Sequence, residues 1–230
     1  SNFVGKTPFA AINLVIPLLK ILGTVGFMLG TGGTALVAAT YGAGDRARAN
    51  RYFSLLVYTA FLIGVVFTVL GFFLIRPVAQ LLGAEGALLE NCILYSRIIL
   101  AAMPFYVLQN MFQSFFVAAE KPRLGLLVTI LSGLTNMILD AVLVILLPQA
   151  YKLAGAAIAT ALAQTVGGIV PLFYFFRKNS SFLRLGKTHF DGGALVKACI
   201  NGSSEFMSNI SMSCRVAFKA ASSMDLHSSR

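Results

Sequence analysis

Long uncharged stretches of apolar residues constrain this chain more than any other feature. Four of them contain no Asp, Glu, Lys or Arg, and they span residues 21–44, 52–75, 98–119 and 153–176. A fifth, 124–147, is interrupted only by Asp140. A helix of about 20 mostly apolar residues crosses a bilayer, whereas the strands of a membrane barrel alternate every second residue. Charged residues make up 11% of the chain, against about 25% in soluble domains, so the sequence predicts a membrane protein and excludes an ordinary soluble enzyme.

These stretches predict an all-α, polytopic membrane helix bundle of about five transmembrane helices plus the start of a sixth. The predicted spans are 8–42, 52–75, 96–119, 124–147 and 153–176. We expect the long first span to be kinked, with a break near Pro17. Domain assignments follow from apolar continuity: 1–187 for the membrane-embedded bundle, 188–213 for a linker and the start of a second lobe, and 214–230 for a tail.

The basic residues predict how the bundle is oriented. The chain carries a net charge of +10, but its Lys and Arg residues fall in short clusters between the apolar stretches, which argues against nucleic-acid binding. Nine basic residues lie in the loops of one face: Arg46, Arg48, Arg51, Lys121, Arg123, Arg177, Lys178, Arg184 and Lys187. Four lie on the other face, so the first face is expected to be cytoplasmic in a multi-pass cell-membrane protein. This orientation places residue 1 outside the cell, and we therefore expect a further helix upstream.

Asp140 is the candidate functional residue within the spans. A carboxylate at mid-membrane costs roughly 2.5–3.5 kcal/mol on insertion scales, so it should face protein or water. Polar residues at helical spacing lie on the same face: Thr129, Ser132, Asn136 and Asp140. Asn136 and Asp140, four residues apart, can share one ligand or one proton network. We expect a cation site, Na⁺ or H⁺, that opens outward. The alternative is a carboxyl group that only joins two helices.

Two further spans carry weaker polar stripes. Gln109, Asn110 and Gln113 lie in the third predicted span, and Thr160 and Gln164 lie in the fifth. Uncharged polar groups in membrane helices often only join helices, at about 0.6 kcal/mol each. Three stripes on three helices nevertheless favour a shared interior cavity. The segment Gly30–Gly33 lacks the Lys of a phosphate loop and instead predicts close helix packing. We expect no enzymatic chemistry, no cofactor and no metal beyond possible Na⁺ at Asp140.

Several motifs resemble multidrug and toxic compound extrusion (MATE) transporters. The strongest is GTGGTALVAATYGAGDRARANRYFS, residues 30–54, which is similar to the end of the family's second helix and the following loop. Phe3-Val-Gly5 resembles the end of the first helix, 104–125 the fourth helix with its turn, Asn136-x-x-x-Asp140 the fifth-helix motif, and 155–160 the start of the sixth. The likeness covers roughly residues 1–213, and the tail departs from it.

The resemblance implies that the five spans are helices two to six of the N-terminal lobe of a two-lobe exporter, in a fragment that lacks the first helix. Such proteins export organic cations and drugs in exchange for Na⁺ or H⁺ by alternating access. By this likeness Asp140 is the ion-coupling carboxylate, with Asn136 and Thr160 beside it. Asn110 and Gln113 fall near cavity-facing positions. The implied partners are membrane lipid, amphiphilic drugs and the C-terminal lobe, and the fragment is expected to be inactive alone.

Two alternatives remain at this point. A flippase for lipid-linked precursors, from the same superfamily, would need a strongly cationic cavity, and few Lys or Arg lie within the spans. A non-transporting membrane subunit would place its polar residues near helix ends rather than in mid-span stripes.

Overall fold

Helices account for nearly all of the regular structure. The computed structural model describes residues 6–228, with side chains for 15–149, 151–213 and 215, so the Phe3-Val-Gly5 motif lies outside the described residues. The elements, in order, are α1 (Lys6–Gly42), α2 (Arg46–Leu81), α3 (Gly86–Ala101), α4 (Met103–Ala118), α5 (Pro122–Leu146), η1 (Gln149–Tyr151), α6 (Lys152–Phe176) and α7 (Gly192–Ser228). Residues 6–228 contain no strand, which confirms the predicted all-α class.

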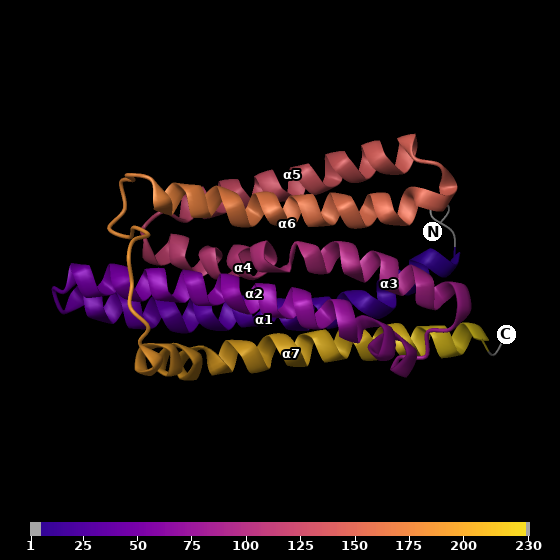
Figure 1. Cartoon of the computed structure of the whole chain (residues 1–230), viewed down its shortest axis with the longest axis horizontal. Helices are drawn as coiled ribbons and strands as arrows, with labels where there is room; N and C mark the ends of the chain where they lie inside the picture. Colours follow the sequence, from indigo (N-terminus) through magenta and orange to yellow (C-terminus); the bar gives the residue numbers. More distant parts are fainter. Residues whose placement is uncertain (1–5, 229–230) are drawn as a thin grey trace.

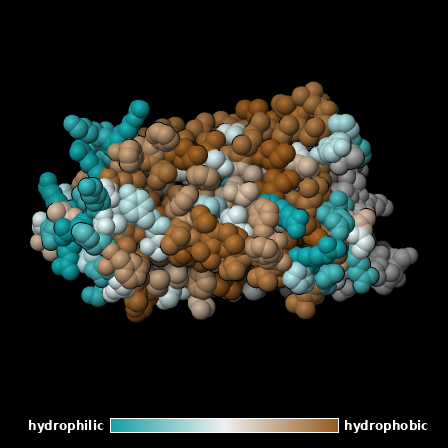
Figure 2. All heavy atoms as spheres, viewed as in Figure 1, coloured by the Kyte–Doolittle hydropathy of each residue, from teal (hydrophilic) through white to brown (hydrophobic). Residues whose placement is uncertain are grey.

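The long helices lie side by side (Figure 1). The hairpin of α5 and α6 forms one side of the bundle, α1, α2 and α4 occupy the middle, and α7 packs along α1 on the opposite side. Apolar residues form a broad belt around the middle of the face shown in Figure 2, and hydrophilic residues gather at the two ends. This is the surface that a bilayer requires, because lipid tails solvate apolar side chains and water solvates the ends.

Four helices are long and apolar enough to cross a membrane: Val15–Gly42 within α1, and α2, α5 and α6. The pair α3–α4 adds a fifth span when it is counted as one bent unit. The number agrees with the sequence prediction. Only 6% of the apolar window of α5 is buried inside the bundle, so this helix presents most of its surface outward.

The third predicted span, 96–119, differs from a single straight helix. It is instead two helices, α3 and α4, which meet at Ala102 with a bend of 57°. Pro104 explains the break, because it has no N–H to donate to the carbonyl of Leu100 and its ring crowds that carbonyl. The Thr68 hydroxyl of α2 donates to this carbonyl instead, at 2.6 Å. The contact also depends on Gly64, where a Cβ atom would clash with the Pro104 backbone.

The predicted break at Pro17 is wrong. The helix α1 is continuous from Lys6 to Gly42 with Pro17 inside it. A proline removes one backbone hydrogen bond, and transmembrane helices tolerate this loss when neighbouring helices pack around the position. Pro17 is buried in the bundle, in agreement with this explanation.

The helix α7 is also continuous, through the boundary predicted after residue 213. It contacts α1 where two glycines face the other helix. A Cβ at Gly32 would meet the carbonyl oxygen of Ala198, and one at Gly202 would meet that of Met28. The expectation that the segment around Gly30–Gly33 permits close helix packing is thereby confirmed. Whether α7 starts a second lobe stays a prediction.

A cluster of aromatic side chains forms the core where α2 begins and α4 and α6 end. Phe53 lies 4.8 Å from Phe115 and 5.0 Å from Phe175, measured between ring centroids, and Phe112 stacks on Phe175 at 5.6 Å. Such ring pairs contribute beyond their buried area. This cluster joins three helices at the end of the bundle that carries the basic loops.

The segment that links α6 to α7, residues 177–191, is attached to the start of α2. The backbone N–H of Arg184 donates to Asn50 Oδ1 at 2.7 Å, and that of Gly186 donates to Ser54 Oγ at 3.0 Å. The Phe182 ring stacks on Tyr41 with centroids 4.0 Å apart. The linker therefore fixes where α7 begins relative to α1 and α2.

We expect Asn50→Ala to loosen this linker. The change removes the hydrogen bond that Asn50 accepts from the linker, worth about 1 kcal/mol, which corresponds to an approximately fivefold larger open population; the bond that Asn50 donates to the Arg46 carbonyl lies within α2. Limited trypsin digestion after Arg184 and Lys187 should accelerate by about that factor. Asn201→Ala, at an exposed position on α7, is the matched control and should leave the rate unchanged. Equal rates for the Asn50 variant and the parent chain would show that the linker is held by other contacts.

Candidate ion and substrate site

Asp140 lies on the face of α5 that packs against α6. The side chain is half-buried, and its Oδ1 atom is buried with no hydrogen-bond partner among the described residues. The two helices approach closely near this level, because Gly155 of α6 leaves room for Leu143 and Leu147 of α5. A buried carboxylate oxygen without a donor is costly, so this atom is a candidate for binding a proton or a cation.

Three uncharged side chains surround this part of the α5–α6 interface. The Asn136 amide, one turn before Asp140, donates from Nδ2 to Thr160 Oγ1 at 3.3 Å. The hydroxyl of Tyr95, on α3, forms a side-chain hydrogen bond with the same Thr160 and interacts electrostatically with Asp140. The structure thus brings together the three predicted ion-coupling residues and adds Tyr95. We call Asp140, Asn136, Thr160 and Tyr95 the Asp140 group.

The composition of the Asp140 group suits a monovalent cation or a proton. Carboxylate, amide and hydroxyl oxygens are the ligands that hard cations prefer. The group contains one carboxylate, so it can neutralise one positive charge. No cluster of three or more His, Cys, Asp or Glu residues that could hold a metal ion occurs within the described part of the chain, and a site for a transition metal is not indicated there.

A second set of polar contacts links α4, α5 and α6. Gln109 of α4 donates from Nε2 to Ser132 Oγ of α5 at 3.3 Å, and Ser132 donates to the Ala163 carbonyl of α6 at 2.8 Å. The Gln109 amide packs directly on Gly167, so a Cβ atom at position 167 would force this side chain to move. Its Oε1 atom is buried without a hydrogen-bond partner in the described part of the chain. Two of the three predicted stripes therefore meet, at Gln109 and Ser132, whereas α6 contributes a backbone carbonyl there rather than Thr160 or Gln164.

Gln164 lies on a cavity of about 170 Å³ between α1, α3, α4 and α6. Its polar lining residues are Lys20, Tyr95, Tyr106, Thr160 and Gln164. Two of them belong to the Asp140 group, so this cavity adjoins the candidate ion site. A larger cavity of about 260 Å³ between α1, α4 and α7 also includes Lys20 and Tyr106 in its lining.

Asn110 and Gln113 do not join these residues. Asn110 is buried at 5% exposure and donates from Nδ2 to the Gly23 carbonyl of α1 at 3.1 Å. Gln113 is exposed and lies with Thr129 on a separate cavity between α4 and α5. The predicted substrate cavity thus contains Gln164 but is not lined by Asn110 or Gln113, because successive polar residues of α4 point to different neighbouring helices.

Comparison with known proteins agrees with this architecture. The MatE family model matches residues 1–142. This chain belongs to the MatE family. It is 27% identical over 179 residues to the multidrug export protein MepA of Staphylococcus saprophyticus, a match that covers 77% of this chain and 39% of MepA. It is 28% identical over 172 residues to MepA of Staphylococcus haemolyticus, covering 75% and 38%.

A solved MatE-type structure shares the fold. The inward-facing conformation of a multidrug resistance MATE family transporter of the MOP superfamily superimposes with a TM-score of 0.85 at 23% identity, covering 94% of this chain and 50% of that one. The chain therefore spans about half the length of this transporter and about two fifths of its curated MepA relatives. The family match confirms the predicted resemblance, the superposition confirms the helix-bundle fold, and the two curated relatives are named as multidrug export proteins.

Two residues at the candidate site, Tyr95 and Lys20, were not predicted from the sequence. Tyr95 lies one residue before the predicted third span began, since hydropathy alone could not detect the extra helix α3. The sequence shows that Lys20 is a charged residue next to an apolar stretch. It does not show that this side chain lines two cavities.

Proposed function

We infer that this chain forms one lobe of a membrane exporter that moves amphiphilic drugs out of the cell in exchange for Na⁺ or H⁺. One observation carries the proposal: the buried, unpaired Asp140 oxygen lies within an apolar helix, next to the hydrogen-bonded Asn136, Thr160 and Tyr95. Two curated relatives are named multidrug export proteins, and these names support a drug as the transported substrate. Transport would require a second lobe.

The proposed mechanism is alternating access. Burial disfavours the charged form of a carboxylate, so Asp140 binds a proton or Na⁺ when its surroundings open to the outside. A neutralised Asp140 no longer opposes the packing of α5 against α6, and the lobe can rearrange. Ion and drug then favour different states, and the difference in binding free energy between those states is the coupling. The basic loops would face the cytoplasm, as positive charges in short loops generally do.

The reconstituted chain allows a direct test of ion binding. A cation that binds only the folded state raises its stability with concentration. We expect the thermal midpoint of the chain in lipid nanodiscs to rise as NaCl replaces choline chloride at constant ionic strength, or as the pH falls if H⁺ is the ion. A midpoint that responds to neither Na⁺ nor pH would contradict the ion site.

The variant Tyr95→Phe should weaken ion binding without removing it. Loss of the hydroxyl removes one hydrogen bond within the Asp140 group, worth about 0.5–1.5 kcal/mol, so half-saturation should need roughly two- to thirteenfold more of the coupling ion. The measurement is the same thermal titration. Tyr151→Phe, at an exposed tyrosine in η1, is the matched control. A titration unchanged from the parent chain would exclude Tyr95 from the site.

A further inference from the structure

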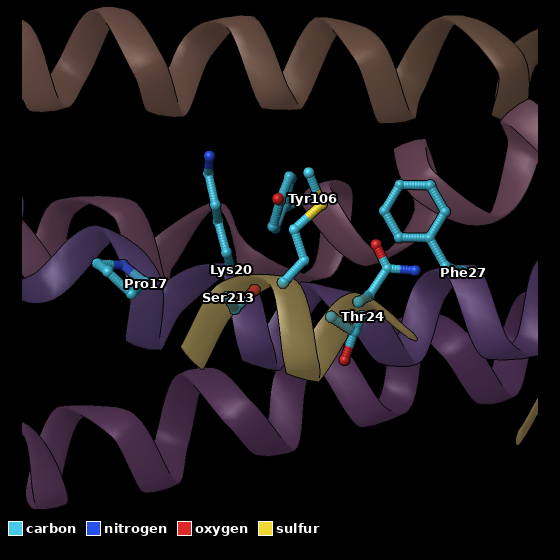
Figure 3. Close-up of a pocket in the computed structure, with 8 residues that line it drawn as sticks. Pro17, Lys20, Thr24, Phe27, Tyr106 and Ser213 are labelled. Carbon is cyan, nitrogen blue, oxygen red and sulfur yellow. The ribbon is translucent and has the colours of Figure 1, made fainter. Parts of the chain in front are cut away.

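Lys20 places an ammonium group on α1 with apolar residues on both sides of it, 15–19 and 21–22. An ionisable residue within a helix that crosses the membrane is a candidate functional residue, and its partner has to be identified. No carboxylate of the described residues serves as that partner, since the ion pair found among them joins Arg76 to Glu90 at the surface. Lys20 is exposed, and Figure 3 shows its side chain extending away from the α1 ribbon beside Tyr106.

The larger of the two cavities at Lys20 is built for a ligand with a polar and an apolar end. Its volume is about 260 Å³. Hydroxyl groups of Tyr106 and Ser213 border it together with the ammonium group, and all three can donate hydrogen bonds to an anion. The remaining wall includes the apolar side chains of Pro17, Phe27 and Met212. This combination of a few convergent polar groups and an apolar wall is typical of small-molecule sites.

The acidic residue nearest in sequence to the α7 residues that line this cavity is already hydrogen-bonded. Glu205 accepts a hydrogen bond from Nδ2 of Asn209, itself a lining residue, at 2.9 Å, and it lies one turn before the cavity-lining part of α7 begins. Neither Glu205 nor Asp140 is among the residues that line either cavity. The charge that a bound molecule meets at Lys20 is therefore positive, so this end of the cavity repels organic cations and attracts anions.

We propose that the Lys20 cavity binds the carboxylate of an amphiphilic molecule, whose apolar body lies against Pro17, Phe27 and Met212. The proposal rests on the transport function above and names a substrate class for it. A carboxylate fits better than a phosphate monoester, because a phosphate carries up to two negative charges and the cavity lining offers one ammonium group. The cavity bridges α1, α4 and α7, so a bound carboxylate would connect α7 to the rest of the bundle.

The test is equilibrium dialysis of the full 230-residue chain in nanodiscs of uncharged lipid, with empty nanodiscs subtracted. The probes share one ring system: 2-naphthoate, its methyl ester, 2-naphthylmethylamine and 2-naphthyl phosphate. We expect 2-naphthoate to bind at least tenfold more tightly than the other three. Lys20→Met should remove that preference, Lys20→Arg should keep it, and Tyr106→Phe should weaken 2-naphthoate binding a few fold. Lys152→Met, at the first residue of α6, is the matched control and should bind as the parent chain does.

Three results would overturn the proposal: equal binding of the acid and its ester, unchanged preference in Lys20→Met, or phosphate binding as tight as that of the carboxylate, which would point to a phospholipid headgroup instead. Lys20→Met replaces a charge by an apolar side chain in an apolar span, so loss of folding is not expected, and circular dichroism checks it. Asp140→Asn separates this proposal from the transport function. It should abolish the response to the coupling ion and leave the preference for 2-naphthoate intact.

Discussion

Replacing Asp140 by asparagine should abolish the response of this lobe to its coupling ion. The amide has nearly the same shape as the carboxyl group but never ionises, so it can neither take up a proton nor neutralise Na⁺. In the isolated chain, the thermal midpoint should no longer rise with the ion. In an exporter that contains this lobe together with a second one, ion-driven drug export should fall to background while membrane insertion stays normal.

The control for this experiment is another carboxylate on the same bundle. Glu90 is exposed on α3 with 68% of its side chain accessible, and it pairs with Arg76 at 3.6 Å. A surface pair of this kind contributes about 0–1 kcal/mol, so Glu90→Gln should leave both the ion response and export intact. Export by the Asp140→Asn protein at the parent rate would remove Asp140 from the mechanism.

Gly32→Val should separate α7 from α1. The new Cβ would meet the carbonyl oxygen of Ala198 and the backbone nitrogen of Gly202. Backbone atoms cannot relieve the clash by changing rotamer, as a flexible side chain can. Overpacking of this kind costs about 1–3 kcal/mol, which lowers the thermal midpoint of a chain of this length by roughly 2–12 °C. Thermal unfolding in nanodiscs, followed by circular dichroism, measures the effect.

Two further glycines make the result specific. Nothing lies within 4 Å of a Cβ at Gly133 on α5, so Gly133→Val should change the midpoint little. Gly202→Val acts on the same crossing from the other side and should lower the midpoint by a similar amount. The double variant should lose less than the sum, because the first substitution already opens the contact. Additive losses would mean that the two positions act separately.

The positions of the spans followed from the sequence because hydropathy is a local property. Asn136 and Asp140 could likewise be placed on one face from their spacing, and the structure puts them beside Thr160 as expected. The bend at Ala102 could not be predicted in the same way. Pro104 marks a lost hydrogen bond, but whether a helix bends or ends there depends on Thr68 and Gly64 of another helix.

The cavity residues were harder to predict, for a related reason. A polar residue in an apolar helix must find a partner, and several neighbouring helices can provide one. Asn110 donates a hydrogen bond to the backbone of α1, and Gln109 donates one to Ser132 of α5. Gln113 is exposed. Spacing along α4 gives the direction of each side chain but not the identity of the neighbour. Lys20 belongs to the same class, since its cavities are completed by helices distant in sequence.

The bend between α3 and α4 has a consequence for the proposed ion site. Tyr95 lies seven residues before Ala102, about 10 Å along the helix, so straightening a 57° bend would shift its backbone by roughly 10 Å. The phenol would then leave Thr160, and the cation proposed to bind at Asp140 would have one oxygen ligand fewer. The hydrogen bond from Thr68 to the Leu100 carbonyl, which helps to hold the bend, therefore also helps to keep Tyr95 beside the proposed ion site, although neither residue belongs to the Asp140 group.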